Sequence, residues 1–268
     1  MSSNIPDGVN LNTAATGKNK SLVYFRSTSL YFVCFFVMSE MLYAHHARHL
    51  VAVDCIIFGF EEDRLKLLLI QRDFPPEKGM WSLMGGFVGM KEGVDEAAQR
   101  VLTTLTGLHD VYLEQVATFG GVRRDTAARV ISVAYYALIN IHEHDESLSQ
   151  EHGAAWFDVH ELPALIFDHQ EMVEQAKSRL KRQATTQPVG FALLPDKFTL
   201  PQLQKLYEAI LDEPIDKRNF QKRIHAMNLL VKLNEKQKGY SKRGAYFYRF
   251  DPERYDRLRA EGLTFLLK

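Results

Sequence analysis

The sequence contains very little cysteine, and this excludes a fold held together by disulfides. Cys34 and Cys55 are the only cysteines among 268 residues, which favours a reducing, cytoplasmic location. Each is expected to be a buried apolar residue rather than a nucleophile. The remaining composition is typical of a globular protein, because 46% of the residues are apolar and 25% are charged. The length suits two modest domains.

The sequence also lacks an apolar run long enough to cross a membrane. Residues 22–38 are strongly apolar, but Arg26 and a Ser-Thr-Ser run leave only the eight apolar residues Leu30–Val37. A membrane-spanning helix needs roughly 20. The small residues of a signal-peptide cleavage site do not follow this run. We therefore expect no membrane anchor and interpret residues 1–40 as a disordered or non-native extension, with Met38 as the natural start.

A net charge of zero hides an uneven distribution of charge along the chain. Residues 196–268 hold 16 Lys and Arg against 10 Asp and Glu, a net charge of +6, so residues 1–195 carry −6. Within residues 217–249 there are ten basic residues and a single acid, Glu235. Such a block predicts a surface that binds a polyanion. A solvated basic face without a partner is the plainer alternative.

One spaced motif lies near the middle of the chain, and it lacks acids where acids are expected. Its spacing resembles the Nudix box, in which a glycine is followed by a glutamate, an arginine, three further carboxylates and a second glycine. The residues that match this pattern are Gly86, Glu92, Arg100, Leu102, Gly107 and Leu108. The three carboxylate positions after the arginine hold Val101, Thr104 and Leu105 instead.

This substitution removes the chemistry that the resemblance implies. In the family, the helix carboxylates hold the divalent metals that polarise a pyrophosphate. Mg²⁺ prefers oxygen ligands, and acids at i, i+3 and i+4 of a helix share one face. We therefore expect no catalytic residue, no metal and no other cofactor. Glu92, Asp95 and Glu96 are expected to stabilise the N-terminus of the box helix, while Glu114 and Asp125 remain alternative metal ligands.

Hydrophobic patterns place a mixed α/β domain around this motif. Apolar runs and β-branched residues predict strands, and apolar spacing of 3.6 residues predicts helices. The predicted strands are 50–60, 65–70, 111–119, 129–141 and 155–157, and the predicted helices are 94–106 and 168–182. The Nudix resemblance implies a mixed sheet sandwiched by helices over residues 41–165, followed by a linking helix within residues 166–190.

A cleft between the sheet and the box helix is expected to bind a small effector after the metal site is lost. Trp81 is predicted to stack on a sugar or base, and Arg123 or Arg124 to hold a phosphate bidentately. Trp81 in the core and an arginine pair in a solvated turn are the alternatives. The predicted effector-binding residues are Arg72, Trp81, Glu92, Phe119, Arg123, Arg124 and Tyr135.

The C-terminal part, residues 191–268, has the pattern of a winged helix-turn-helix. Thr199 and Asp216 are good helix N-caps, and each precedes a short amphipathic helix, the second of which is basic. Residues 235–250 then predict a basic hairpin that forms a wing. The predicted DNA-binding residues are Lys217, Arg218, Asn219, Gln221, Lys222, Arg223, Lys236, Lys238, Lys242 and Arg243.

The order of the two domains is similar to that of the Nudix-related transcriptional regulators, with Phe198–Ile210 and Asp216–Arg223 as the most specific segments. Members control NAD metabolism or pentose use, and they commonly dimerise. Ser82–Val88 and Tyr135–Leu138 resemble the sugar-responsive branch most. The resemblance implies a cytoplasmic homodimer that binds double-stranded operator DNA. It also implies a small-molecule effector, which would be a pentose, a sugar phosphate or an ADP-ribose-like compound.

Two other functions are consistent with parts of the sequence. The first is a Mg²⁺-dependent Nudix hydrolase that acts on a nucleoside diphosphate derivative through an irregular metal site. The second is an RNA-binding adaptor, which would present stacking aromatic residues on an open surface. Tyr246 and Tyr248 in the predicted wing are the aromatic residues that would serve this role.

Overall fold

The computed structural model describes residues 43–107, 109, 111–141, 153–237, 244–262, 265 and 267. The predictions for residues 1–40, and those for Lys238, Lys242 and Arg243, lie outside the described residues. The segment His49–Lys268 forms one compact unit. Within the described part of the chain, no helix is long and apolar enough to span a bilayer.

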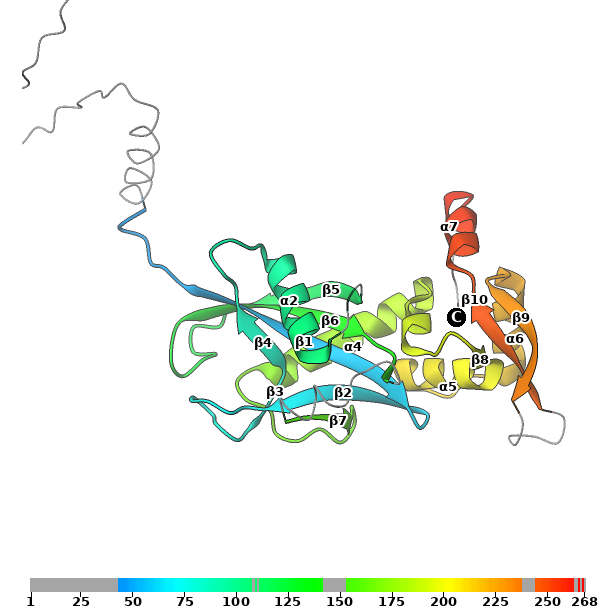
Figure 1. The fold of residues 1–268 in the computed structure, drawn as a ribbon, viewed down its shortest axis with the longest axis horizontal. Coiled ribbons are helices and arrows are strands. Elements are labelled where there is room, and N and C mark those ends of the chain that lie inside the picture. Colours follow the sequence, from blue (N-terminus) through cyan, green and yellow to red (C-terminus); the bar gives the residue numbers. More distant parts are fainter. Residues whose placement is uncertain are drawn as a thin grey trace, which may run out of the picture. The chain divides into compact units, whose positions relative to one another are not determined.

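A mixed seven-stranded sheet is organised around the long strand β1 (Leu50–Glu61), as Figure 1 shows. β1 pairs parallel with β6 and antiparallel with β2 and β4, and this mixture is the one that the Nudix resemblance implies. β5 extends the sheet beyond β6, while β3 and β7 both pair with β2. The bounds are β2 (Arg64–Gln71), β3 (Trp81–Ser82), β4 (Met84–Phe87), β5 (Tyr112–Phe119), β6 (Val130–Leu138) and β7 (Ala154–Asp158).

Both faces of the sheet are buried, each against a different helix. Side chains alternate between the two faces of a strand, so Ile56 and Phe58 of β1 belong to one core and Cys55 and Ile57 to the other. The first core includes helix α4 (His169–Thr186), and the second includes helix α2 (Val94–Thr106). This confirms the predicted sheet between helices, and it places Cys55 in the core as a buried free thiol.

Helix α2 has the bounds that the sequence predicts, because its ends carry clear signals. The Gly93 amide donates to the Glu96 carboxylate at 2.8 Å across the first turn. Gly107 ends the helix in the left-handed region, with φ of 71°, where a residue without a Cβ is favoured. Of the three acids expected to stabilise this N-terminus, Glu96 does so through the Gly93 amide.

The C-terminal part forms the predicted helix pair and wing. The Thr199 side chain accepts from the Gln202 amide at the start of α5, and the Asp216 side chain accepts from the Asn219 amide at the start of α6. A three-stranded sheet in the order β8, β10, β9 completes the winged helix. The bounds are β8 (Phe198–Thr199), α5 (Leu200–Leu211), α6 (Lys217–Met227), β9 (Leu230–Gln237) and β10 (Ala245–Phe250).

Three features of this region are not in the sequence-based prediction. Helix α4 continues four residues past Arg182, to Thr186, and the short 3-10 helix η2 (Val189–Leu193) follows it. After the wing, helix α7 (Pro252–Ala260) begins at the N-cap Asp251, whose side chain accepts from the Arg254 amide. Helix α7 has no buried residue, so the apolar spacing that would predict a helix is missing.

The two parts of the chain share one apolar core. Leu203 and Leu206 of α5 are fully buried in the same cluster as Leu67 of β2 and Leu180 of α4. Non-polar side chains in continuous contact gain stability together, because each covers surface that the other would expose to water.

Leu206→Ala should therefore destabilise the whole unit. We expect a loss of roughly 2–5 kcal/mol, from the lost transfer free energy and the cavity that remains. Leu50→Ala is the matched control, because Leu50 is 48% exposed, and it should cost about 0.5 kcal/mol or less. Urea denaturation followed by circular dichroism measures both values. Equal losses in the two variants would contradict the shared core.

Candidate functional site

The single acid that the box retains, Glu92, is held by the box arginine. The Arg100 guanidinium donates to the two Glu92 carboxylate oxygens, at 2.6 Å and 2.9 Å. The Gly89 amide donates to the same carboxylate at 2.7 Å. The hydrogen bond from Arg100, followed by that from Gly89, lowers the pKa of Glu92 to about 2. Glu92 therefore fixes the loop before α2.

The positions that lost their acids have become packing or surface positions. Val101 is buried in the core beneath α2, and its Cγ2 lies 2.9 Å from where a Cβ on Gly86 would be. Leu105 packs against the same core, and Thr104 is exposed. This confirms that Val101 and Leu105 extend the apolar face of the box helix.

The described residues contain no group of three or more His, Cys, Asp or Glu side chains that is arranged to hold a metal ion. The two acids considered as replacement ligands have other contacts. Glu114 accepts from Arg179 Nε at 2.7 Å, and Asp125 accepts from the Ala127 amide at 2.7 Å. Each therefore has a local structural role in the fold.

A cavity of about 460 Å³ lies beside β1, β4 and the start of α4. Its walls combine apolar side chains with charged groups of both signs, as small-molecule sites commonly do. The ionisable residues that line it are Asp54, Arg72, Asp73, Arg124, Asp125 and His169. Gly85 and Gly86 also line it, and a Cβ on Gly85 would lie 2.4 Å from Asp54 Oδ1.

The most buried charged group in this cavity is Arg124, whose side chain is 4% exposed. It forms a bidentate pair with Asp168, with Nη2 to Oδ1 at 2.7 Å and Nε to Oδ2 at 2.9 Å. Its Nη2 also lies 3.6 Å from Asp54 Oδ2. Burial acts to lower the pKa of Arg124, but the hydrogen bonds and charge of Asp168 and the charge of Asp54 raise it. The guanidinium is therefore charged and shared by two carboxylates.

Asp54 has two further neighbours that keep it in place. The Ser132 hydroxyl donates to its Oδ2 at 2.5 Å, and Nε2 of the buried His169 lies 3.7 Å from its Oδ1. The Leu83 amide donates to Nδ1 of His169 at 3.1 Å, so this nitrogen is the acceptor and the proton is placed on Nε2. Burial lowers the pKa of His169, which keeps the ring neutral at physiological pH.

The structure brings two of the seven predicted effector residues, Arg72 and Arg124, into this cavity. The other five described residues of that prediction do not line it. Trp81 is partly buried and packs against the core, with its ring edge-on to Phe157. The others are the buried Phe119 and Tyr135, the exposed Arg123, and Glu92 in its pair with Arg100.

The alternative from the sequence places Arg124 in a solvated turn, but the structure buries its side chain. Asp54 and Asp168 pair with the buried guanidinium. The sequence reasoning did not assign a role to Asp54, Asp168 or His169. Asp54 inside the apolar run 50–60 is the signal in the sequence that could have indicated a charged partner, because a buried charge needs one. Nothing local in the sequence identifies that partner.

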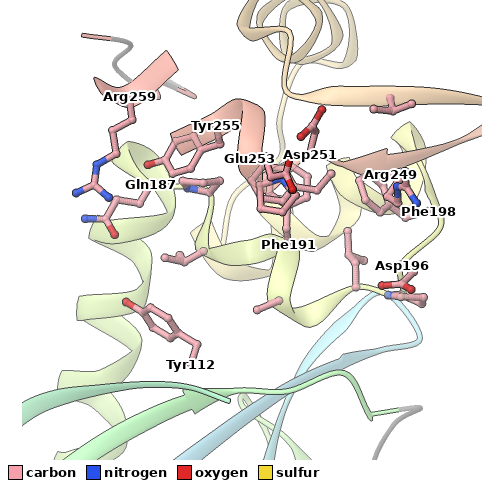
Figure 2. A pocket seen from close by; sticks show the side chains of 18 residues that line it. Tyr112, Gln187, Phe191, Asp196, Phe198, Arg249, Asp251, Glu253, Tyr255 and Arg259 are labelled. Atoms are coloured by element: carbon pink, nitrogen blue, oxygen red, sulfur yellow. The ribbon is translucent and has the colours of Figure 1, made fainter. Parts of the chain in front are cut away.

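A larger hollow of about 920 Å³ lies between β5, the segment after α4, the wing and α7. Figure 2 shows that its labelled side chains include acids, arginines and aromatic residues, such as Asp251, Arg259 and Phe191. Phe191 stacks on Phe250 at 4.4 Å between ring centroids. None of the residues that line this hollow belongs to the Nudix box, whereas Gly86 of the box lines the smaller cavity.

Helix α6 presents a polar basic face. Its apolar residues Phe220, Ile224 and Met227 are buried, which confirms the predicted inward face. The predicted DNA-binding residues of this helix are on its other faces. Lys217, Arg218, Asn219, Lys222 and Arg223 are exposed, and Gln221 is half-buried.

Three basic residues of α6 and the wing contact other groups of the protein itself. Arg223 Nη1 donates to the Leu267 carbonyl oxygen at 2.7 Å. In the wing, Lys236 and Lys232 lie over the ring of Tyr246, with ammonium-to-centroid distances of 4.4 Å and 3.7 Å. Tyr246 is 39% exposed, so the described part of the wing presents an aromatic ring between two cations.

Comparison with known proteins identifies both halves of the chain. Residues 48–177 match the NUDIX domain, and residues 190–250 match the NrtR DNA-binding winged helix domain. The chain is 34% identical over 211 residues to the ADPR responsive transcriptional repressor NtrR of Acinetobacter baylyi. The matched residues are 77% of this chain and 84% of the relative. The chain belongs to the NrtR family of Nudix-related transcriptional regulators.

Two further relatives resemble this chain, one over most of its length and one over half of it. The crystal structure of Shewanella oneidensis NrtR complexed with a 27mer DNA is 30% identical, with a TM-score of 0.69, and covers 77% of this chain and 95% of that one. An ADP-ribose pyrophosphatase of Methanocaldococcus jannaschii is 36% identical over 133 residues, which are 50% of this chain and 74% of the relative. The family assignment confirms the predicted combination of a Nudix-like domain and a winged helix.

The Glu92–Arg100 pair predicts a particular dependence of stability on pH. The folded-state pKa of Glu92 is lowered from 4.5 to about 2, so the carboxylate adds stability that is complete above the unfolded value and is lost as the pH falls toward 2. Glu92→Gln removes this titration. Between pH 6 and pH 3, the wild type should therefore lose more stability than the variant in urea denaturation. Equal losses would contradict the lowered pKa.

Restoring an acid at Val101 should damage the fold. Val101→Glu places a carboxylate in an apolar core without a partner, and we expect a loss of about 2 kcal/mol or more in thermal denaturation. Thr104→Glu adds the same charge at an exposed position of the same helix and should change stability by about 0.5 kcal/mol or less. A stable Val101→Glu variant would show that the box helix still has room for a carboxylate at this position.

Proposed function

We propose that this protein is a cytoplasmic, homodimeric transcriptional repressor that binds operator DNA through its winged helix and releases or retains it in response to ADP-ribose. The observation that carries this proposal is that the two faces of helix α6 differ in burial and in charge. Its apolar side chains are buried in the shared core, while its basic and amide side chains face outward beside a basic wing.

Helix α6 is the element that we assign to the major groove. A recognition helix reads base edges with residues near its N-terminus and holds phosphates with flanking cations. Lys217, Arg218, Asn219 and Lys222 are exposed and meet this requirement. Two such helices in a dimer would lie about 34 Å apart, which is one turn of duplex. The Shewanella oneidensis relative, whose crystal structure contains a 27mer DNA, supports this role.

The cavity beside β1 is the site that we assign to ADP-ribose. Arg72 and Arg124 line it, and a guanidinium matches the geometry of phosphate oxygens. The apolar part of its wall suits a nucleoside. The sequence predicts a pentose, a sugar phosphate or an ADP-ribose-like compound as effector. Among these we propose ADP-ribose, because the Acinetobacter baylyi relative is described as ADPR responsive.

The Nudix-like domain is proposed to bind without turning over its ligand. Metal-assisted hydrolysis needs carboxylates that hold the ion against the pyrophosphate. Val101 is packed in the core, Leu105 extends that packing, and Glu92 is held by Arg100. These contacts support a regulator rather than an enzyme. They distinguish this chain from what the name of the Methanocaldococcus jannaschii relative states for that protein.

The DNA-binding part of the proposal predicts a specific loss in Lys222→Ala. A duplex selected from a random-sequence library serves as the operator, and fluorescence anisotropy over a range of salt concentrations measures binding. Loss of one phosphate contact should weaken binding to all sequences and lower the slope of log K against log salt by about 1. Lys91→Ala, on the exposed loop before α2, is the control and should bind like the wild type.

Two results would contradict the proposed function. The first is a wild-type protein that binds the selected duplex no better than an unrelated one. The second is Mg²⁺-dependent release of phosphate-containing products from ADP-ribose by the full chain, abolished in Glu92→Gln, because this would restore the hydrolase alternative.

A further inference from the structure

Helix α4 begins at the effector cavity and ends at the DNA-binding domain. His169 at its first turn lines the cavity, while Leu180 and Ala184 near its end belong to the core that includes α5 and α6. At 1.5 Å per residue, the helix is about 27 Å long. A rigid element of this length can carry a displacement from one site to the other.

The end of α4 is joined to the recognition helix by hydrogen bonds through the C-terminal tail. The Leu267 amide donates to the Thr185 carbonyl oxygen at 3.3 Å. The Leu267 carbonyl oxygen accepts from Arg223 of α6 at 2.7 Å. Leu267 is buried as well. A shift of α4 would therefore change the position of a residue on the DNA-binding helix.

Two residues attach the beginning of α4 to the cavity: His169, which accepts from the Leu83 amide, and Asp168, which precedes the first turn. Its carboxylate forms the bidentate pair with Arg124, and it makes no side-chain hydrogen bond to cap its own helix. The preceding residue, Phe167, has φ of 49°, a conformation that costs energy for a bulky side chain and that must be held by its surroundings. The Arg124–Asp168 pair is one of the contacts that hold this turn.

Charge makes this attachment sensitive to an anion. Arg124 serves both Asp54 and Asp168, and His169 is kept neutral by burial. Asp54, Asp168 and Arg124 together carry one net negative charge, and Arg72 lines the same cavity. A phosphate group that binds Arg124 adds further negative charge and competes with the two carboxylates for the guanidinium.

Asp168 is the carboxylate that can leave. Asp54 is held inside β1 by Ser132 and lies next to His169. The Asp168 side chain is 19% exposed against 11% for Asp54, so water can hydrate it when it turns outward. We propose that Asp168 is the sensing residue of this protein: a diphosphate ligand displaces it from Arg124, and the released first turn of α4 changes the position of the recognition helix.

This inference rests on the proposed function, because it explains how the ligand of that cavity alters DNA binding. Thermodynamically, the ligand acts only if it binds the state with Asp168 released better than the state with Asp168 paired. Removing the competing carboxylate should therefore help the ligand and uncouple it from DNA. These two effects together distinguish a sensing residue from a structural one.

The test uses the full chain and four proteins: wild type, Asp168→Asn, Asp168→Ser and Glu171→Gln. Asn and Ser both remove the charge and are good N-cap residues. Glu171 lies in the same first turn, is exposed and accepts from Gln175 at 3.1 Å, so Glu171→Gln is the matched control. Calorimetry measures the Kd of ADP-ribose without DNA, and anisotropy measures the operator Kd with and without saturating ADP-ribose.

We expect both Asp168 variants to bind ADP-ribose about 3-fold to 10-fold more tightly than the wild type, because the competitor for Arg124 is gone. The ratio of operator Kd values with and without ADP-ribose should fall to less than about one third of the wild-type ratio. Glu171→Gln should retain both wild-type values. Thermal denaturation checks that each variant is folded, and Asp168→Ser replaces Asp168→Asn if the latter is not.

The possible failures are separable. If the wild type binds operator and responds to ADP-ribose, but a folded Asp168 variant keeps a coupling ratio within about 2-fold of it, the role of Asp168 is overturned and the proposed function stands. If Glu171→Gln loses coupling to the same extent, the effect belongs to the net charge of the turn and the inference also fails. If the wild type itself shows no response to ADP-ribose, the proposed function fails and the inference fails with it.

Discussion

A single buried carboxylate, Asp54, constrains how this protein is assembled around its central strand. β1 is covered on both faces, so a charge in this strand requires partners inside the fold. Ser132 supplies a hydrogen bond, and Arg124 supplies the opposite charge. Arg124 in turn brings Asp168 and the start of α4 to the same place. The position of the helix that leads to the DNA-binding domain therefore depends on a charge that the sheet has to neutralise.

The residues of the Nudix box have clear structural contacts in this chain. The glycines, the arginine and Glu92 still shape the loop and the start of α2, because Arg100 and the Gly89 amide hold the Glu92 carboxylate. Val101 fills the space under the helix against Gly86. In this chain, residues of the motif therefore pack a helix on a sheet.

Most of the fold was predictable because its signals are local. Glycine at position 107 marks the end of α2, and the capping residues Thr199 and Asp216 mark the starts of α5 and α6. Helix α7 escaped prediction because it buries none of its residues. The extra turn of α4 escaped prediction because residues 183–186 have no apolar repeat strong enough to extend the pattern, although Ala184 is fully buried in the shared core.

The sequence alone determined the fold class, the two functional halves and the inward face of the recognition helix, because periodicity and capping act between residues that are near each other in the chain. Only the tertiary structure decided which residues line the cavity beside β1. Tyr135 is buried in the core and Trp81 packs against the core, whereas Asp54, Arg124 and Asp168 meet although 44 residues or more separate neighbouring members of the trio. The reason is that a buried charge pairs with a group that is close to it in the folded structure, and residues that are close in the fold can be far apart in the sequence.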